Sequence, residues 1–266
     1  MARWEEFKRW MLADGSYSRQ TVEQYSCIAR LFEGYAEARG GGRPLRDVLV
    51  DFLSTVDDRS KPHYKTALKK FLEFVGEKDL AAGLRVGSRP INQLEWFWSE
   101  DEVRRIIGAC RNLRERLIVK FAYYQAMRRK EILSLTADDI DLEGMKVRVR
   151  LAKKRGTRFL YKDLYPDQAR EIREYLEANG IRGGERLFKM TPVRLHAIFT
   201  GIVRRAGVRP AGIHGLRHAR AAHMRMRGVP LDVLSKWLGH EGLNVTMIYA
   251  HIGPQTFAKE IPPPEV

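Results

Sequence analysis

The sequence predicts a mainly α-helical protein of two domains, the second of which contains one small β-hairpin. Three observations support this fold class. Apolar residues recur three and four positions apart along most of the chain, as on the buried face of a helix. Only residues 139–163 alternate between apolar and polar side chains, which is the period of a strand. Residues 77–98 interrupt both periods with glycine, serine and proline, and they are the best candidate for a linker.

The first domain, residues 1–82, is predicted to be a small helical bundle. Ser18 is a suitable N-cap for its second helix, because a serine hydroxyl accepts a hydrogen bond from an unpaired backbone N–H. Three consecutive glycines, residues 40–42, end that helix. The expected helices are 2–13, 19–38, 44–54 and 60–75, and their apolar faces close one core. No set of residues in this domain suggests catalysis.

A linker over residues 83–94 is expected to lead into a second domain, residues 95–266. Ser99 and the acidic residues 100–102 predict the start of a helix, where negative charge is favourable. The segments KVRVRL and TRFLYK predict two strands joined by a turn at residues 153–156. The other expected helices are 100–110, 112–125, 127–134, 166–179, 192–206, 214–227, 230–238 and 243–251, and the tail PPPEV is expected to be extended.

The charge of the chain predicts a polyanionic partner. Lys and Arg number 48 against 33 Asp and Glu, which gives a net charge of +15. Most of that charge lies in residues 96–266, and arginine is commoner than lysine. Because the arginine fork matches phosphate oxygens, this bias favours nucleic acid over an anionic membrane.

Several classes of protein and site are disfavoured by composition. Cys27 and Cys110 suit core packing and are too few for a disulfide framework or a cysteine-based zinc site. The opening MARWEEFKRW contains acids and no long apolar run, so no signal peptide is expected. No stretch of about 18 apolar residues occurs, so neither a membrane span nor a membrane partner is expected. The chain is expected to be soluble and intracellular.

The most informative stretch is residues 214–251. His214, Arg217 and His218 lie three and four positions apart, on one face of the expected helix. His240 follows the expected turn Leu238-Gly239, and Tyr249 lies nine residues further on. Each residue alone has an ordinary structural explanation. A zinc site at the histidines is disfavoured, since no acidic motif accompanies them.

The order and spacing of these residues together resemble the tyrosine recombinase (phage integrase) family, and most closely its Xer branch. SRQTVEQY resembles the opening of that family's core-binding domain, and YYQAMRRKEILSL resembles the box with the first catalytic arginine. KVRVRLAKKRGTRFLY is similar to the hairpin with the catalytic lysine. HGLRHARAAHMRMRGVPLDVLSKWLGH resembles the histidine-x-x-arginine box and the histidine after it, and VTMIYAHI resembles the nucleophile box. The resemblance covers roughly residues 16–252 and is weakest in the first 95.

The resemblance implies a two-domain clamp on duplex DNA, made of a helical core-binding domain and a mixed catalytic domain. It implies strand cleavage through a 3′-phosphotyrosyl intermediate, with no cofactor and no metal. Fixed cations must then stabilise the charge that builds up on the phosphoryl group. The implied catalytic residues are Arg128, Lys153, His214, Arg217, His240 and the nucleophile Tyr249, with Glu131 in support. The implied role of His214 is to help handle the tyrosine proton, and that of His240 is to hydrogen-bond the phosphate.

This sequence departs from the family pattern in two places. The hairpin of the family usually reads Gly-Lys-Gly, whereas Lys153 and Lys154 are adjacent here, so either is a candidate general acid. Counting back from Arg158 favours Lys153. Ala126 and Arg129 stand where glycine and a small apolar residue are commoner, and Arg129 either reaches DNA or faces solvent.

The resemblance predicts a site-specific DNA recombinase, of the Xer type that resolves chromosome or plasmid dimers. A homotetramer acting on a double-stranded DNA recombination site, cytoplasmic and nucleoid-associated, is implied. The arginine-rich hairpin and compact form resemble the archaeal members. The alternatives are a plasmid or viral integrase, a type IB topoisomerase-like enzyme, and a DNA-binding architectural protein without catalysis.

Overall fold

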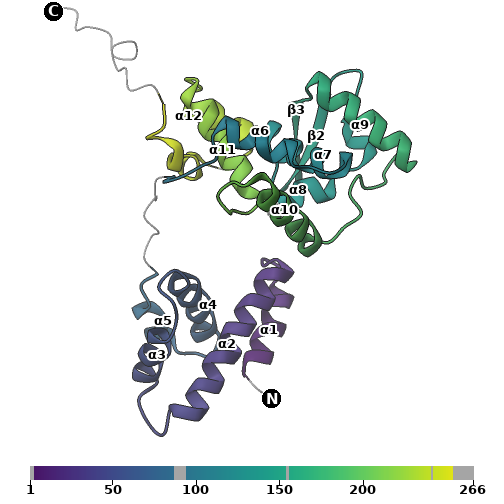
Figure 1. Ribbon diagram of the computed structural model, residues 1–266. Coiled ribbons are helices and arrows are strands. Elements are labelled where there is room, and N and C mark those ends of the chain that lie inside the picture. Colours follow the sequence, from purple (N-terminus) through teal and green to yellow (C-terminus); the bar gives the residue numbers. More distant parts are fainter. Residues whose placement is uncertain (1–2, 87–93, 154–155, 241, 254–266) are drawn as a thin grey trace, which may run out of the picture. The chain divides into compact units, whose positions relative to one another are not determined.

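The computed structural model describes residues 3–86, 94–153, 156–240 and 242–253 of the 266-residue chain. Two compact units form, residues 1–90 and 91–266, and each is described by itself. Helices dominate both units, and a small antiparallel sheet lies in the second (Figure 1). The predicted fold class is confirmed. Most of the predicted linker, residues 83–94, and the tail PPPEV lie outside the described residues.

The first unit is a helical bundle. The Ser18 hydroxyl caps its second helix by accepting a hydrogen bond from the Thr21 N–H at 3.1 Å, as the sequence predicts. Phe7 and Leu68 are completely buried in its core, where ring-on-ring contacts between aromatic side chains add to the apolar packing. The helices described are α1 (Arg3–Asp14), α2 (Arg19–Arg39), α3 (Leu45–Ser54), α4 (Lys61–Phe74) and α5 (Lys78–Gly83).

The short helix α5 corrects one expectation. It occupies part of the segment 77–98, which the sequence marks as an irregular linker. Ala81 is 1% exposed and Leu84 is 9% exposed, and both pack into the core of the first unit. Burial of these two side chains outweighs the weak helical signal of so short a segment.

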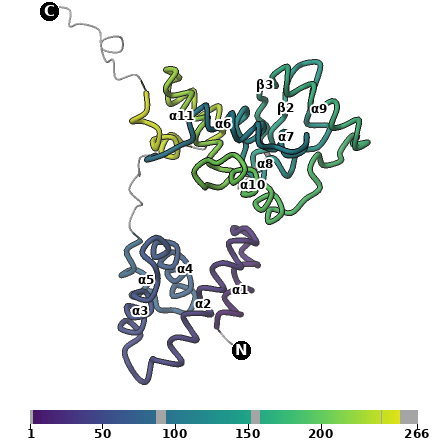
Figure 2. The backbone as a smooth tube through the Cα atoms, viewed as in Figure 1, coloured from purple at the N-terminus to yellow at the C-terminus, as the bar shows by residue number. Residues whose placement is uncertain are grey.

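The second unit packs its helices against one face of a small sheet. Its helices are α6 (Glu100–Gly108), α7 (Leu113–Tyr124), α8 (Arg129–Ser134), α9 (Pro166–Asn179), α10 (Pro192–Ala206), α11 (His214–Met226) and α12 (Leu231–Leu238). The helix α11 lies against α6, α7 and α12 (Figures 1 and 2). The predicted Ser99 cap is confirmed, because Ser99 and Glu102 exchange the two hydrogen bonds of a capping box.

The sheet consists of β1 (Ile140–Asp141), β2 (Lys146–Lys153) and β3 (Gly156–Asp163), in that order and antiparallel. The predicted hairpin is confirmed, and the two-residue strand β1 is an addition that the sequence did not predict. Val147 pairs with Lys162 and Val149 pairs with Leu160, so these residues share the inward face. Arg148 and Arg150 share the opposite face.

The prediction of one helix over residues 243–251 is wrong. Two single-turn 3-10 helices take its place, η2 (Leu243–Val245) and η3 (Met247–Tyr249), which meet at Thr246. The Thr246 hydroxyl is within 2.8 Å of His240 Nδ1. A threonine whose side chain forms a hydrogen bond of this kind does not favour a continuous helix. The outcome is a compact double turn that carries Tyr249.

Candidate active site

The first arginine box begins where α7 ends. Ala126 has a left-handed backbone, with φ at 49°, which is a conformation that glycine adopts more readily than alanine. Arg128 follows as the residue that precedes α8. The Glu131 carboxylate accepts from the Arg128 backbone N–H at 2.7 Å and from its Nη1 at 2.8 Å. Glu131 therefore fixes both the main chain and the side chain of Arg128.

Arg217 lies on α11 and is almost completely buried, with 2% of its surface exposed. Its Nη1 donates to the Ala126 carbonyl at 2.5 Å, and its Nη2 donates to the Leu238 carbonyl at 2.8 Å. Nη2 also lies 3.0 Å from His240 Nε2. Since a guanidinium has five N–H donors, the acceptors found among the described residues do not exhaust its capacity. Arg217 joins the turn after α7 to the end of α12.

His240 is held by contacts to both of its ring nitrogens. The helix α12 ends at Gly239, whose φ of 70° turns the chain sharply toward the site. Burial, and then the charges of Arg217 and Arg128, lower the pKa of His240 to about 3. The ring is thus neutral near pH 7, which lets Nε2 accept a hydrogen bond from Arg217 while Nδ1 faces the Thr246 hydroxyl.

Tyr249 is buried, with 1% exposed, in a small apolar cluster formed by α11, α12 and η3. Its hydroxyl lies 2.7 Å from His218 Nδ1. Burial raises the pKa of Tyr249 to about 12, against the opposing charges of Arg217 and Arg128. The sequence placed His218 on the right helical face but assigned it no role. Its contact to Tyr249 spans 31 residues, so local spacing could not identify it.

His214 is exposed, one turn before His218 on α11, and their ring centroids are 4.7 Å apart. It lines a pocket of about 340 Å³ together with Arg128 and His196. Arg129 and Lys130 also line this pocket. The pocket is strongly basic, as a binding place for a phosphate requires.

Lys162 is a second residue that the sequence did not indicate. It lies on the inward face of β3 and is 3% exposed. Its Nζ donates to the Gln125 carbonyl at 2.5 Å and lies 4.0 Å from the centre of the Trp237 ring. Burial, and then the charge of Arg217, lower the pKa of Lys162 to about 7. The alternation in TRFLYK, which puts Lys162 in phase with Leu160, was the available signal.

Replacing Lys162 with Met should change how stability depends on pH. An unfolded lysine has a pKa of about 10.4, so between about pH 7 and pH 10 the unfolded chain binds a proton that the folded chain lacks. Stability of the wild type therefore rises with pH in this window, by up to about 1.4 kcal/mol per pH unit relative to Lys162→Met. Denaturant titrations at several pH values measure this difference. Parallel curves for the two proteins would contradict the low pKa.

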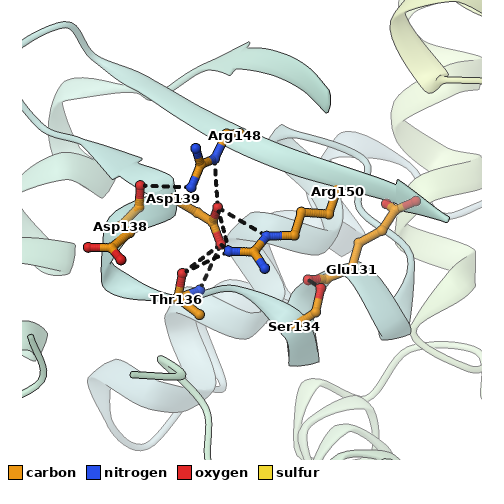
Figure 3. Close-up of polar contacts among 7 residues, drawn as sticks. All are labelled: Glu131, Ser134, Thr136, Asp138, Asp139, Arg148 and Arg150. Carbon is orange, nitrogen blue, oxygen red and sulfur yellow. Dashed lines mark hydrogen bonds and ion pairs between the residues drawn. The ribbon is translucent and has the colours of Figure 1, made fainter. Parts of the chain in front are cut away.

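The base of the hairpin is anchored by Asp139, which ends η1 (Ala137–Asp139) and is 2% exposed (Figure 3). Its carboxylate accepts from Arg148 at 2.9 Å, from Arg150 at 3.3 Å and from the Thr136 hydroxyl at 2.8 Å. Two of the arginines that suggested DNA binding are thus committed to an internal ion pair. This network fixes β2 at Arg148 and Arg150.

The candidate lysines come at the end of β2 in the sequence. Lys153 ends β2, and its side chain lies outside the described residues, as does the whole of Lys154. The structure therefore brings together Arg128, Glu131, Arg217 and His240, and connects Tyr249 and His214 to them through α11. The assignment of the hairpin lysine stays a prediction.

Within the described residues, no group of three or more His, Cys, Asp and Glu side chains is arranged to hold a metal ion. In the same part of the chain, no helix has both the length and the apolar content needed to span a bilayer.

Comparison with known proteins identifies the family. Residues 97–256 match the phage integrase family over most of the second unit. The chain belongs to the phage integrase family. Its relatives within this family include the tyrosine recombinase XerA of Saccharolobus solfataricus, which is 26% identical over 193 residues. That match covers 71% of this chain and 62% of the relative, so it spans less than two thirds of the relative's length.

A second relative is covered more fully. The tyrosine recombinase XerA of Pyrococcus furiosus is 29% identical over 262 residues, which are 93% of this chain and 88% of the relative. Among solved structures, the pre-cleavage complex of the XerH site-specific recombinase with its difH substrate has a TM-score of 0.72. It covers 90% of this chain and 78% of that one at 21% identity, which establishes the shared fold. This phage integrase family member is a DNA strand-transferring, site-specific recombinase.

Proposed function

We propose that this protein is an Xer-type recombinase in which Tyr249 attacks a DNA phosphate held by Arg128 and Arg217. The observation that carries the proposal is the bonding of buried Arg217 to the Arg128 turn and to His240. Arg128 and Arg217 both lie within 4.0 Å of the Glu131 carboxylate, and their positive charges also act on the buried Lys162. Such a cluster of cations favours an anion between them, and phosphate is the anion that a DNA strand offers.

Cleavage needs groups that bind the phosphate, a nucleophile, and side chains that orient both. Arg128 and Arg217 bind the non-bridging oxygens and stabilise the charge of the pentacoordinate phosphoryl group. Tyr249 forms a 3′-phosphotyrosyl bond as the 5′-oxygen leaves, and the intermediate retains the energy for rejoining. Glu131 orients Arg128, and His240 orients Arg217 and is available to the phosphate. His214, beside the basic pocket, contacts the phosphate as well.

The test of this function is a covalent adduct on a nicked suicide substrate. The nick releases the 5′-end after cleavage, so rejoining is prevented and the protein–DNA adduct accumulates. Peptide mapping of the adduct should identify Tyr249, and sequencing of the trapped ends gives the recombination site. An architectural DNA-binding protein would form no adduct. A topoisomerase would relax supercoiled DNA without needing two matched sites.

The leaving 5′-oxygen needs a proton, and we assign it to Lys153 at the tip of the hairpin. Lys153→Ala is expected to cleave ordinary DNA at least about 100-fold more slowly, which is the usual loss on removing a general acid. It should regain most of its rate when the leaving oxygen is replaced by sulfur, because a thiolate leaves without a proton. Single-turnover cleavage of the two substrates measures this.

Lys154→Ala is the matched control. It should show a binding defect that is equal on both substrates, as for a lysine that only contacts phosphate. Sulfur rescue of Lys154→Ala in place of Lys153→Ala would move the assignment to Lys154. If sulfur rescues neither variant, the acid is not in the hairpin.

The Xer-type role implies a homotetramer that pairs two double-stranded recombination sites at the nucleoid, in the cytoplasm. Resemblance of sequence and fold to Xer recombinases supports this assembly. A plasmid with two directly repeated sites should be resolved into two circles. Efficient insertion into unrelated DNA, with poor resolution, would favour an integrase instead.

A further inference from the structure

Two histidine–tyrosine pairs on α11 have nearly the same geometry. His218 Nδ1 lies 2.7 Å from the Tyr249 hydroxyl, and His223 Nδ1 lies 2.8 Å from the Tyr123 hydroxyl. The second pair lies in the apolar core beside Phe97, away from the arginine cluster. The first pair contains the proposed nucleophile and directly follows Arg217 along the helix.

We propose that His218, and not His214, accepts the proton of Tyr249 during strand cleavage and returns it during rejoining. This inference rests on the proposed function, in which Tyr249 is the nucleophile. Geometry comes first for any general base, and a separation of 2.7 Å is within direct proton-transfer distance. His214 is exposed and its ring packs against His218, so it lies one step further from the phenol.

The protonation states agree with this role. Burial, and then the charge of Arg217, lower the pKa of His218, so its imidazole is a free base near pH 7. The phenol, with a pKa of about 12, is protonated at the same pH. An ionised fraction this small makes a poor nucleophile, so the reaction gains from a base that removes the proton as the new bond forms.

The groups that face this pair are mostly cationic or neutral. On α11 itself they are His214 and Arg217, and Arg128 acts on Tyr249 from the turn after α7. These positive charges disfavour a charged imidazolium while the site is empty. A bound phosphate supplies the negative charge that makes proton acceptance by His218 easier.

The step is balanced in atoms and charge. The Tyr249 O–H bond breaks and its proton moves to His218 Nδ1. The phenolic oxygen forms a bond to phosphorus, the bond from phosphorus to the 5′-oxygen breaks, and the leaving oxygen takes a proton from the general acid. Rejoining runs in reverse, so His218 begins that step as the imidazolium. No oxidant, metal or cofactor takes part.

His218→Asn is the most informative variant, because the asparagine side chain ends where Nδ1 of histidine lies. It retains a polar group beside Tyr249 but cannot take a proton. Single-turnover cleavage should be measured on the sulfur-bridged substrate, where the general acid is not needed. The wild-type rate is expected to be nearly constant from about pH 7 to pH 9. The variant is expected to be about 100-fold slower at pH 7 and to gain about tenfold per pH unit, as ionised phenol accumulates.

His223→Asn is the control, because it breaks the equivalent pair away from the reacting atoms. It should retain the flat pH profile of the wild type, whatever its loss of stability. A His218→Asn rate that stays flat with pH, slow or not, would overturn the proposal and leave His218 a packing residue. A pH slope in His214→Asn in place of His218→Asn would move the role to His214.

A rescue experiment distinguishes loss of the base from misfolding of His218→Asn. Fluorinated tyrosine at position 249 has a more acidic phenol, which needs less help from a base. It should restore cleavage to His218→Asn at pH 7 and change the wild-type rate little. Failure to restore cleavage in a folded variant would contradict proton acceptance. The variant Tyr249→Phe tests the proposed function separately from the role of His218. An adduct that persists in Tyr249→Phe would refute Tyr249 as the nucleophile, whatever His218 does.

Discussion

Tyr249→Phe is expected to keep the fold and the affinity for DNA while losing covalent attachment by more than about 10⁴-fold. The ring retains its place in the apolar cluster of α11, α12 and η3, and only the hydroxyl is lost. The His218 hydrogen bond disappears with it, which costs on the order of 1 kcal/mol. Gel analysis of the suicide-substrate adduct, with DNA binding measured in parallel, checks the prediction.

Two other tyrosines serve as internal controls. The Tyr123 hydroxyl is paired with His223 in the core, and the Tyr124 hydroxyl donates to Asp167 at 3.4 Å. Tyr123→Phe and Tyr124→Phe should therefore both form the adduct. An adduct that persists in Tyr249→Phe and disappears in one of these two would show that the nucleophile has been misassigned.

Arg217→Lys is expected to damage cleavage nearly as much as Arg217→Ala, by about 100- to 1,000-fold. Lysine keeps the positive charge, but it cannot direct separate donors to Ala126, Leu238 and a phosphate at once. Buried carbonyls would lose their partners, so a loss of about 3 kcal/mol in the free energy of unfolding is also expected. Cleavage rates and denaturant titrations measure the two effects separately.

Arg220→Lys is a matched control on the same helix. Arg220 donates to the Tyr165 hydroxyl at 2.9 Å and its guanidinium lies 5.6 Å from the centre of the Tyr123 ring, so its contacts are not with the two carbonyls that Arg217 holds. Its stability and cleavage rate should stay close to those of the wild type. If Arg217→Lys cleaved as fast as Arg220→Lys, a point charge would be sufficient and the fork would have no catalytic role.

Much of the fold could be predicted because its signals are local. The Ser18 and Ser99 caps depend on residues only three positions away, and both occur as expected. The alternation of β2 likewise predicts which side chains face inward. The structure of segment 243–251 could not be predicted in this way, because the Thr246 hydroxyl contacts His240, which lies outside that segment.

The candidate site shows the same division. Motif spacing predicted Arg128, Arg217, His240 and Tyr249, and the network around Arg217 unites the first three. Lys162 was not identified because its partners are distant in sequence: Gln125 follows α7, and Trp237 lies on α12. His218 escaped because its partner lies on η3. A residue whose meaning depends on a distant partner carries little information in its own segment.

The bonding of Arg217 has a consequence for decayed copies of such a gene. Its guanidinium ties the turn after α7 to the end of α12 through two main-chain carbonyls, before any DNA arrives. A copy that has lost all activity but must still fold is under pressure to retain this arginine. The Tyr249 hydroxyl has no such protection, since phenylalanine fills the same space. In inactive descendants, Arg217 should therefore be retained longer than Tyr249. The presence of this arginine alone does not indicate that such a protein is still active.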